Sequence, residues 1–182
     1  MLLFSLGISH ASAGVIGNIP LNSQVILDSS KSSAIEWEET PEGTWMPTPE
    51  QARESLSAIQ TYLEASSDEK NVTAVIGVNR EERRTWIASE IRKILANKDG
   101  YRVQFWGVVK NKQRIIICNF FPAIGSGEKD EFPMWREQEV SVADGGYYFW
   151  QVAYDPTSKK IINFESNGYA WNEINTVASL PI

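Results

Sequence analysis

Residues 140–155 constrain the fold most, because two apolar runs there flank an Asp-Gly-Gly sequence at 144–146. Glycine supplies the positive φ that a tight hairpin turn requires, so we expect a strand, a turn and a second strand. Four aromatic residues follow the turn at 147–150. Side chains alternate along a strand, which places Tyr148 and Trp150 on the same face. Both faces of this strand need cover, one from the core and the other from a helix, a loop or a partner.

Three further strands are predicted at residues 101–109, 114–121 and 160–165, where apolar residues alternate or run without a break. The run at 114–121 is apolar almost throughout, which indicates a central strand that is buried on both faces. Short loops between consecutive strands favour antiparallel neighbours. We therefore expect an antiparallel meander of about five strands between residues 101 and 166.

Two helices are predicted, at 49–66 and 80–96. The first has Thr48 as its N-cap, Pro49 in its first turn and Gln51 at the position that completes a capping box. In both segments apolar residues recur at helical spacing and form one stripe. The fold class is therefore α+β, with two helices packed on the meander. A cystatin-like arrangement is the closest familiar shape with this order of elements.

The N-terminal segment is typical of an exported protein. An apolar run at residues 1–8 precedes the small residues Ala-Ser-Ala at 11–13, which fit a signal-peptide cleavage site. An alternative is that this run is a short buried element. We expect a signal segment at 1–13, an irregular segment at 14–47 in which residues 24–27 could form a short strand, and a single α+β domain at 48–182. The protein would then be periplasmic or secreted, and no stretch is long enough to span a membrane.

Composition and single residues exclude several classes of chemistry. The formal net charge is −6, which disfavours nucleic acid as a partner because such binding requires a basic surface. The only cysteine, Cys118, lies in an apolar strand and is expected to be a buried, inert thiol. The only histidine, His10, lies in the signal segment. We therefore predict that the protein is not an enzyme and holds no metal and no cofactor.

Three function classes remain open after these exclusions. The first is a non-enzymatic binding protein that engages a protein partner in the bacterial envelope, in an inhibitor-like or immunity-like role. The second is a module that binds a sugar or peptide on an aromatic face formed by Trp106, Tyr148 and Trp150. These aromatics could instead fill a second small core. The third is a carboxylate-based hydrolase, which would draw on acids such as Glu128, Asp130, Glu131 or Asp144.

The candidate site residues follow from the first two classes. The candidate binding residues are aromatic and come from the strands and from the long loop at 122–137: Trp106, Trp135, Tyr148 and Trp150. Long loops of this kind are often functional. The predicted structural turn consists of Asp144, Gly145 and Gly146. The oligomeric state is left open.

Several short motifs resemble those of a family of uncharacterised small bacterial envelope proteins. They cover roughly residues 45–170 and comprise Tyr101-Arg102-x-Gln104-x-x-Gly107, Asn119-Phe120-Phe121, Trp135, Val142-x-Asp144-Gly145-Gly146, Tyr154-Asp155 and Asn167-Gly168-x-Ala170. The resemblance implies an exported bacterial protein that is sometimes anchored by a lipid. This chain departs from that pattern, because no cysteine follows its apolar segment to carry a lipid. The motif residues are of turn and core type, so the resemblance implies no active site.

Overall fold

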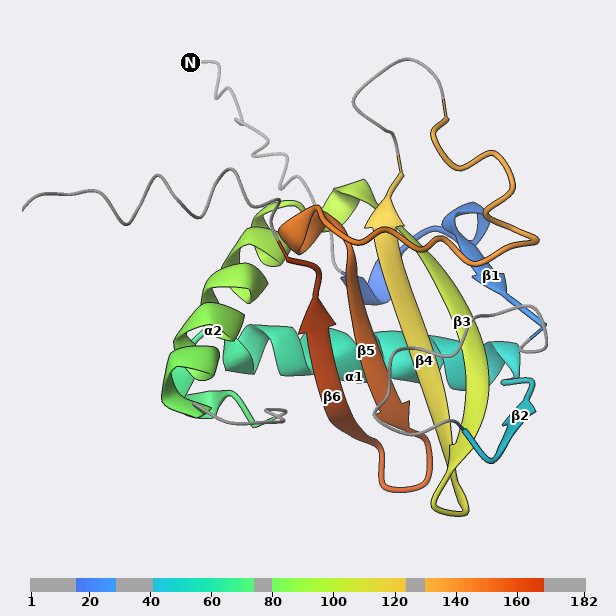
Figure 1. Cartoon of the computed structure of the whole chain (residues 1–182), viewed down its shortest axis with the longest axis horizontal. Coiled ribbons are helices and arrows are strands. Elements are labelled where there is room, and N and C mark those ends of the chain that lie inside the picture. The colour runs from blue at the N-terminus through green and yellow to red at the C-terminus, as the bar shows by residue number, and fades with distance from the viewer. Residues whose placement is uncertain (1–15, 29–40, 74–79, 124–129, 169–182) are drawn as a thin grey trace, which may run out of the picture.

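The computed structural model describes residues 16–28, 41–73, 80–123 and 130–168. It confirms an α+β fold with two α-helices and a six-stranded mixed sheet (Figure 1). The helices are α1 (Pro49–Ser66) and α2 (Arg80–Ala96), and the strands are β1 (Gln24–Ile26), β2 (Gly43–Trp45), β3 (Tyr101–Lys110), β4 (Gln113–Pro122), β5 (Trp150–Asp155) and β6 (Lys160–Ser166). Short 3-10 helices include η1 (Ile16–Asn18), η2 (Leu21–Ser23), η4 (Glu69–Asn71), η5 (Lys98–Gly100) and η6 (Gly146–Tyr148).

Strands β3 to β6 form the predicted antiparallel meander, but with four strands rather than about five. The turn between β3 and β4 contains Asn111 and Lys112 with φ of 51° and 62°. Positive φ at both positions is the geometry of the tight hairpin turn that matches strand twist. Strand β4 lies in the middle of the meander, and seven consecutive residues of it are buried. The predicted central strand is thus confirmed.

The segment at 14–47 was expected to be irregular apart from a short strand at 24–27. It supplies two strands to the sheet, β1 within those residues and β2 outside them. Strand β1 pairs with β3 in parallel, and β2 pairs with β3 in antiparallel orientation further along the same strand. Both strands are three residues long, so their local sequence signal is weak. They form because β3 is long enough to hydrogen-bond with both: β1 pairs with residues 103–105 of β3, and β2 pairs with residues 107–109.

The predicted hairpin at 140–155 is wrong in its first half. Gly145 and Gly146 do have positive φ, 110° and 53°, as expected. However, residues 140–143 form no strand, η6 begins at Gly146 itself, and the strand starts only at Trp150. The backbone before the glycines bonds to side chains instead of to a strand. The Val140 N–H donates to Gln104, and the Val140 carbonyl accepts from Asn119. The turn residues therefore end a loop that crosses the sheet rather than joining two strands.

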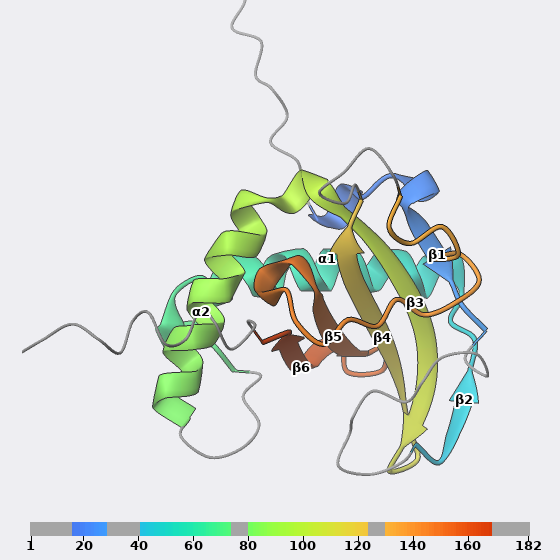
Figure 2. The same cartoon turned by 45° about the horizontal axis from the view of Figure 1, so that its top comes forward.

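Both helices contribute to one core on one side of the sheet. Helix α1 begins with the predicted capping box, in which Thr48 and Gln51 exchange side-chain to backbone hydrogen bonds of 2.9 and 3.2 Å. Helix α1 crosses behind the strands, and α2 lies at one end of α1, near β6 (Figures 1 and 2). The buried stripe of α1 is that predicted from the sequence: Ala52, Leu56, Ile59 and Leu63. Ile87, Ile91 and Ile94 of α2 join the same core.

Candidate binding surface

A row of polar side chains crosses the sheet on the face opposite the helices. Gln104 of β3, Asn119 of β4 and Gln151 of β5 are direct cross-strand neighbours. Asn119 donates to Gln104 Oε1 at 3.0 Å and accepts from Gln151 Nε2 at 3.1 Å. Gln104 and Asn119 are both buried. Buried amides are costly unless they are hydrogen-bonded, so this row must have further partners.

Those partners belong to the loop that follows β4. Gln104 Nε2 donates to the carbonyl oxygens of Trp135 and Gln138, at 2.5 and 2.7 Å. Its Oε1 accepts from the backbone N–H of Val140 at 2.9 Å, and Asn119 donates to the Val140 carbonyl at the same distance. One side chain thus holds three separate backbone groups of the loop. Residues 135–140 are fixed on the sheet by side chains and not by strand pairing.

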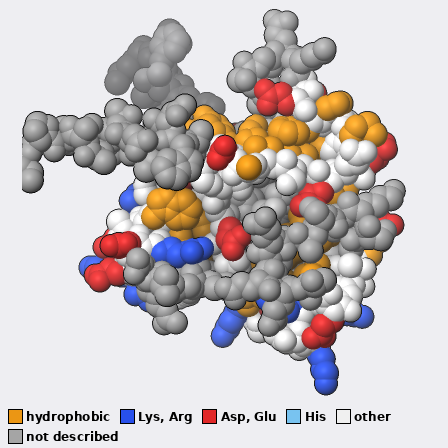
Figure 3. Space-filling model, in the orientation of Figure 1, with side chains coloured by type: hydrophobic (Ala, Val, Ile, Leu, Met, Phe, Trp, Pro, Cys, Tyr) orange, Lys and Arg blue, Asp and Glu red, His pale blue; other side chains and the backbone are white. Residues whose placement is uncertain are grey.

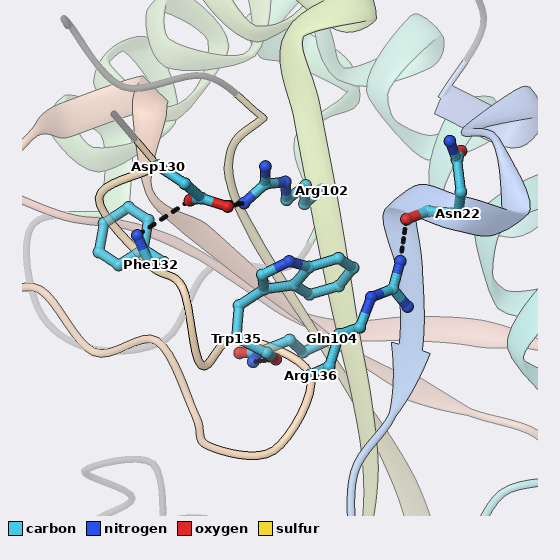
Figure 4. Close-up of polar contacts among 7 residues, drawn as sticks. All are labelled: Asn22, Arg102, Gln104, Asp130, Phe132, Trp135 and Arg136. Carbon is cyan, nitrogen blue, oxygen red and sulfur yellow. Dashed lines mark hydrogen bonds and ion pairs between the residues drawn. The ribbon is translucent and has the colours of Figure 1, made fainter. Parts of the chain in front are cut away.

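Trp135 anchors the same loop through its ring. It is 6% exposed and packs with Phe121 and Val140 in a small apolar cluster. The guanidinium groups of Arg102 and Arg136 lie 5.2 and 4.2 Å from its ring centroid (Figure 4). Cation–π contacts of this kind favour one fixed ring position. Trp135, a predicted binding residue, is therefore mainly an anchor of the loop.

Arg102 also binds the acid at the start of the described loop. Its Nη1 lies 2.8 and 2.9 Å from the two carboxylate oxygens of Asp130. The Arg102 hydrogen bond, followed by one from the backbone N–H of Phe132, lowers the pKa of Asp130. Asp130 was a candidate acid for hydrolysis, and here its carboxylate is engaged in holding the loop. Glu128 lies outside the described residues.

Arg136 attaches the loop to the N-terminal edge of the sheet. Its guanidinium donates to the carbonyl oxygen of Gln24 at 3.3 Å and to that of Asn22 (Figure 4). Large apolar side chains stay exposed on the two segments that this contact joins, Leu21 at 81% and Met134 at 46%. We call this region, made of Leu21, Met134, Arg136 and the backbone at Asn22 and Gln24, the loop–edge surface. Figure 3 shows hydrophobic side chains gathered along the upper margin of the molecule, over the loop.

A groove adjoins the loop–edge surface on the side of α1. Its volume is about 240 Å³, and its lining includes Leu21, Ile26, Pro49, Ala52, Phe105 and Arg53. We call it the edge groove, because β1 is the last strand of the sheet on this side. Arg53 is exposed, and within the described residues its guanidinium makes no ion pair. The groove is thus mainly apolar with one cation at its rim.

The predicted aromatic face does not form. Trp106 and Trp150 are both 0% exposed and lie on opposite sides of the sheet. Trp150 stacks on Phe120 in the helix-side core, with ring centroids 3.7 Å apart, whereas Trp106 packs in the cluster on the other side. The register explains this, because Trp106 is opposite Ile117 and Trp150 is opposite Phe120, and positions 117 and 120 face opposite sides. Tyr148, in η6, remains 45% exposed.

The remaining candidate groups for chemistry have structural surroundings. Burial raises the pKa of Cys118 to about 12, although Ser55 Oγ lies 3.4 Å from its sulfur and acts in the other direction. Asp144 takes part in an isolated bridge to Gly168, and its backbone carbonyl accepts from Asn167. In the described ranges, no three His, Cys, Asp or Glu residues gather as metal ligands would. Neither described helix has the length and apolarity needed to cross a membrane.

The residues that sequence reasoning missed are Gln104, Asn119 and Arg136. Asn119 interrupts an otherwise apolar strand, and this signal could have found it, because a polar side chain in such a run must be satisfied by another part of the chain. Arg136 carries no comparable signal. Comparison with known proteins gives no match, either to a protein family, to a curated protein or to a solved structure.

Proposed function

We propose that this chain is a non-enzymatic binding protein that engages a protein partner through the loop–edge surface. The observation that carries the proposal is that Leu21 and Met134 stay exposed on two segments that Arg136 ties together. Large apolar side chains in exposed positions favour association when they are grouped and rimmed by polar residues. Arg136, which joins the two segments, supplies such a polar group.

Preorganisation supports the same proposal. Binding costs conformational entropy when a loop must be ordered at the interface, and a loop that is already fixed avoids that cost. Here Gln104 holds the loop by hydrogen bonds and Trp135 holds it by packing. The side chain of Met134, which directly precedes the anchored Trp135, is thus displayed at a defined position. An exposed apolar side chain on a rigid support is typical of an interface anchor.

The location of this function is a further part of the proposal. The apolar run at 1–8 and the Ala-Ser-Ala sequence at 11–13 favour export to the bacterial envelope, and these residues lie outside the described ranges. The mature chain would then meet its partner in the periplasm or outside the cell. Mass spectrometry of natively expressed protein tests this directly, and an intact Met1 in a cytoplasmic fraction would contradict it.

Site-specific photo-crosslinking tests the binding function. A photoreactive amino acid is introduced at Met134 or Leu21, and at Met46 as a matched control, because Met46 is also an exposed methionine. We expect one discrete crosslinked product from the first two positions in cells and none from position 46. Crosslinking should fall when Arg136 is replaced by glutamate. Equal products from all three positions, or no product from 134 and 21, would refute the proposed surface.

A further inference from the structure

The outer edge of β1 is open among the described residues. Within the part of the chain that the structure describes, β1 pairs with β3 alone, and the Leu27 N–H donates to the Phe105 carbonyl at 2.8 Å. Backbone groups alternate in direction along a strand, so Val25 and Leu27 face β3 while Ile26 turns its N–H and C=O outward. Edge strands are commonly protected by charged side chains or proline, and β1 has neither.

The backbone of Gln24 is already occupied on this side. The Gln24 N–H donates to the Leu21 carbonyl, and the Gln24 carbonyl accepts from Arg136. Added backbone pairing is therefore confined to Ile26 and its neighbours toward the C-terminus. This geometry suits a short extended peptide better than a long strand, because within β1 only Ile26 offers both of its backbone groups.

The edge groove lies beside this position and can receive a side chain. Ile26 and Leu21 line it together with the first turns of α1, represented by Ala52. At about 240 Å³ the groove is smaller than the roughly 300–1,000 Å³ of pockets for drug-sized ligands, which suits a single side chain better than a whole small molecule. A peptide paired with Ile26 would direct alternate side chains to either side of the sheet edge, so one of them enters the groove.

The positive charge of Arg53 at the rim of the edge groove favours a ligand with an acidic group. Arg53 lines the groove and is exposed without an ion pair among the described residues. The chain as a whole carries a net charge of −6, so an exposed cation beside an apolar groove is not a consequence of general basicity. A carboxylate next to the apolar anchor would pair with this guanidinium.

We propose that β1 and the edge groove bind a short extended peptide of the partner, with one apolar side chain in the groove and an acidic residue paired with Arg53. This inference rests on the proposed function and specifies how part of the partner is recognised. Backbone pairing with Ile26 supplies affinity that is independent of peptide sequence, and the groove and Arg53 supply specificity.

A phage-displayed library of random dodecapeptides, selected on the full chain, tests the inference. Enriched peptides should share an apolar residue next to Asp or Glu and should bind Arg53→Glu about tenfold more weakly or worse. Lys70→Glu is the matched control, since it makes the same charge change beyond the other end of α1 and should leave binding unchanged. Selection on Arg53→Glu should instead enrich basic peptides.

Amide hydrogen exchange locates the bound peptide. The Ile26 N–H should exchange more slowly when a selected peptide is present, whereas amides of α2 should not change. Failure to enrich such peptides, equal effects of the two charge reversals, or unchanged exchange at Ile26 would each overturn the inference. If any of these results is obtained while position 134 still crosslinks to a partner, only the proposed binding of a peptide at β1 is wrong. If positions 134 and 21 give no crosslinked product, the proposed function itself is refuted.

Discussion

Replacing Gln104 by glutamate should test whether the polar row holds the loop. The substitution keeps the shape of the side chain but exchanges its NH₂ group for an oxygen. Two carbonyl oxygens, those of Trp135 and Gln138, then lose their donor at 2.5 and 2.7 Å. A buried group left unsatisfied costs about 1–3 kcal/mol, so Gln104→Glu should lower the free energy of unfolding by about 2–6 kcal/mol at neutral pH.

The loss of stability in Gln104→Glu should become larger as pH rises. Burial and the two facing carbonyls disfavour the charged form, so the folded-state pKa of the introduced carboxyl lies above the value of about 4.3 in the unfolded chain. Below that value the acid is protonated in both states and can donate one of the two lost bonds. As pH rises above about 4.3, the unfolded state ionises first, and stability falls by about 1.4 kcal/mol per pH unit until the folded-state pKa is reached.

Urea unfolding at a series of pH values measures this effect. Gln138→Glu is the control, because the Gln138 side chain is exposed in the same loop and the chemical change is identical. The difference between the variants removes the contribution of all other titrating groups. Trypsin cleavage after Arg136 reports separately on local release of the loop, which should increase only in Gln104→Glu. Equal unfolding curves and equal cleavage in the two variants would refute the argument that this side chain fixes the loop.

Three further substitutions test the packing. Gly107→Ala places a Cβ against the backbone carbonyl of Trp45 and 2.6 Å from its ring, so both the ring and the paired backbone of β2 must move. The free energy of unfolding should fall by about 1–3 kcal/mol, and an unchanged urea midpoint would contradict this. Gly145→Ala adds a side chain at φ 110° and 2.5 Å from the Phe149 ring, and should cost about 1–3 kcal/mol in the same assay, whereas parent-like unfolding would argue against the turn geometry. Trp106→Ala should lower the free energy of unfolding by about 3–5 kcal/mol, since the ring is fully buried. Unfolding like that of the parent would contradict the burial of this side chain.

The elements that the sequence predicted well are those whose signals are local. Helix α1 has its cap, its proline and its apolar stripe within one continuous segment, and both of its ends are found where expected. Strands β3 and β4 are equally local, because a two-residue turn joins them and fixes their register. Such features require no information about distant residues. Their prediction therefore succeeded without knowledge of the tertiary structure.

The failed predictions depend on residues that are distant in the sequence. Residues 140–143 look like a strand because Val140 and Val142 alternate with small residues, but the Val140 N–H donates to Gln104, 36 residues earlier in the chain. Trp106 and Trp150 were placed on one face by assuming a register that only the positions of β4 and β5 could fix. A one-residue change in register moves every side chain to the other face. The separation of the two tryptophans could not be derived from alternation within each strand.

The amide groups of the polar row are already hydrogen-bonded within the protein, so a ligand would have to contact other groups. Gln104 uses both its donor and its acceptor atoms on the loop and on Asn119, so it has little capacity left for a ligand. Its role is to position the loop, and the recognition that we propose falls to groups that remain exposed above it. Those groups are Met134 on the loop and Leu21 at the edge, with the cation Arg136 between their segments. The buried row and the exposed surface are thus coupled, because weakening the Gln104 hydrogen bonds should disturb the position of Met134 before it unfolds the sheet.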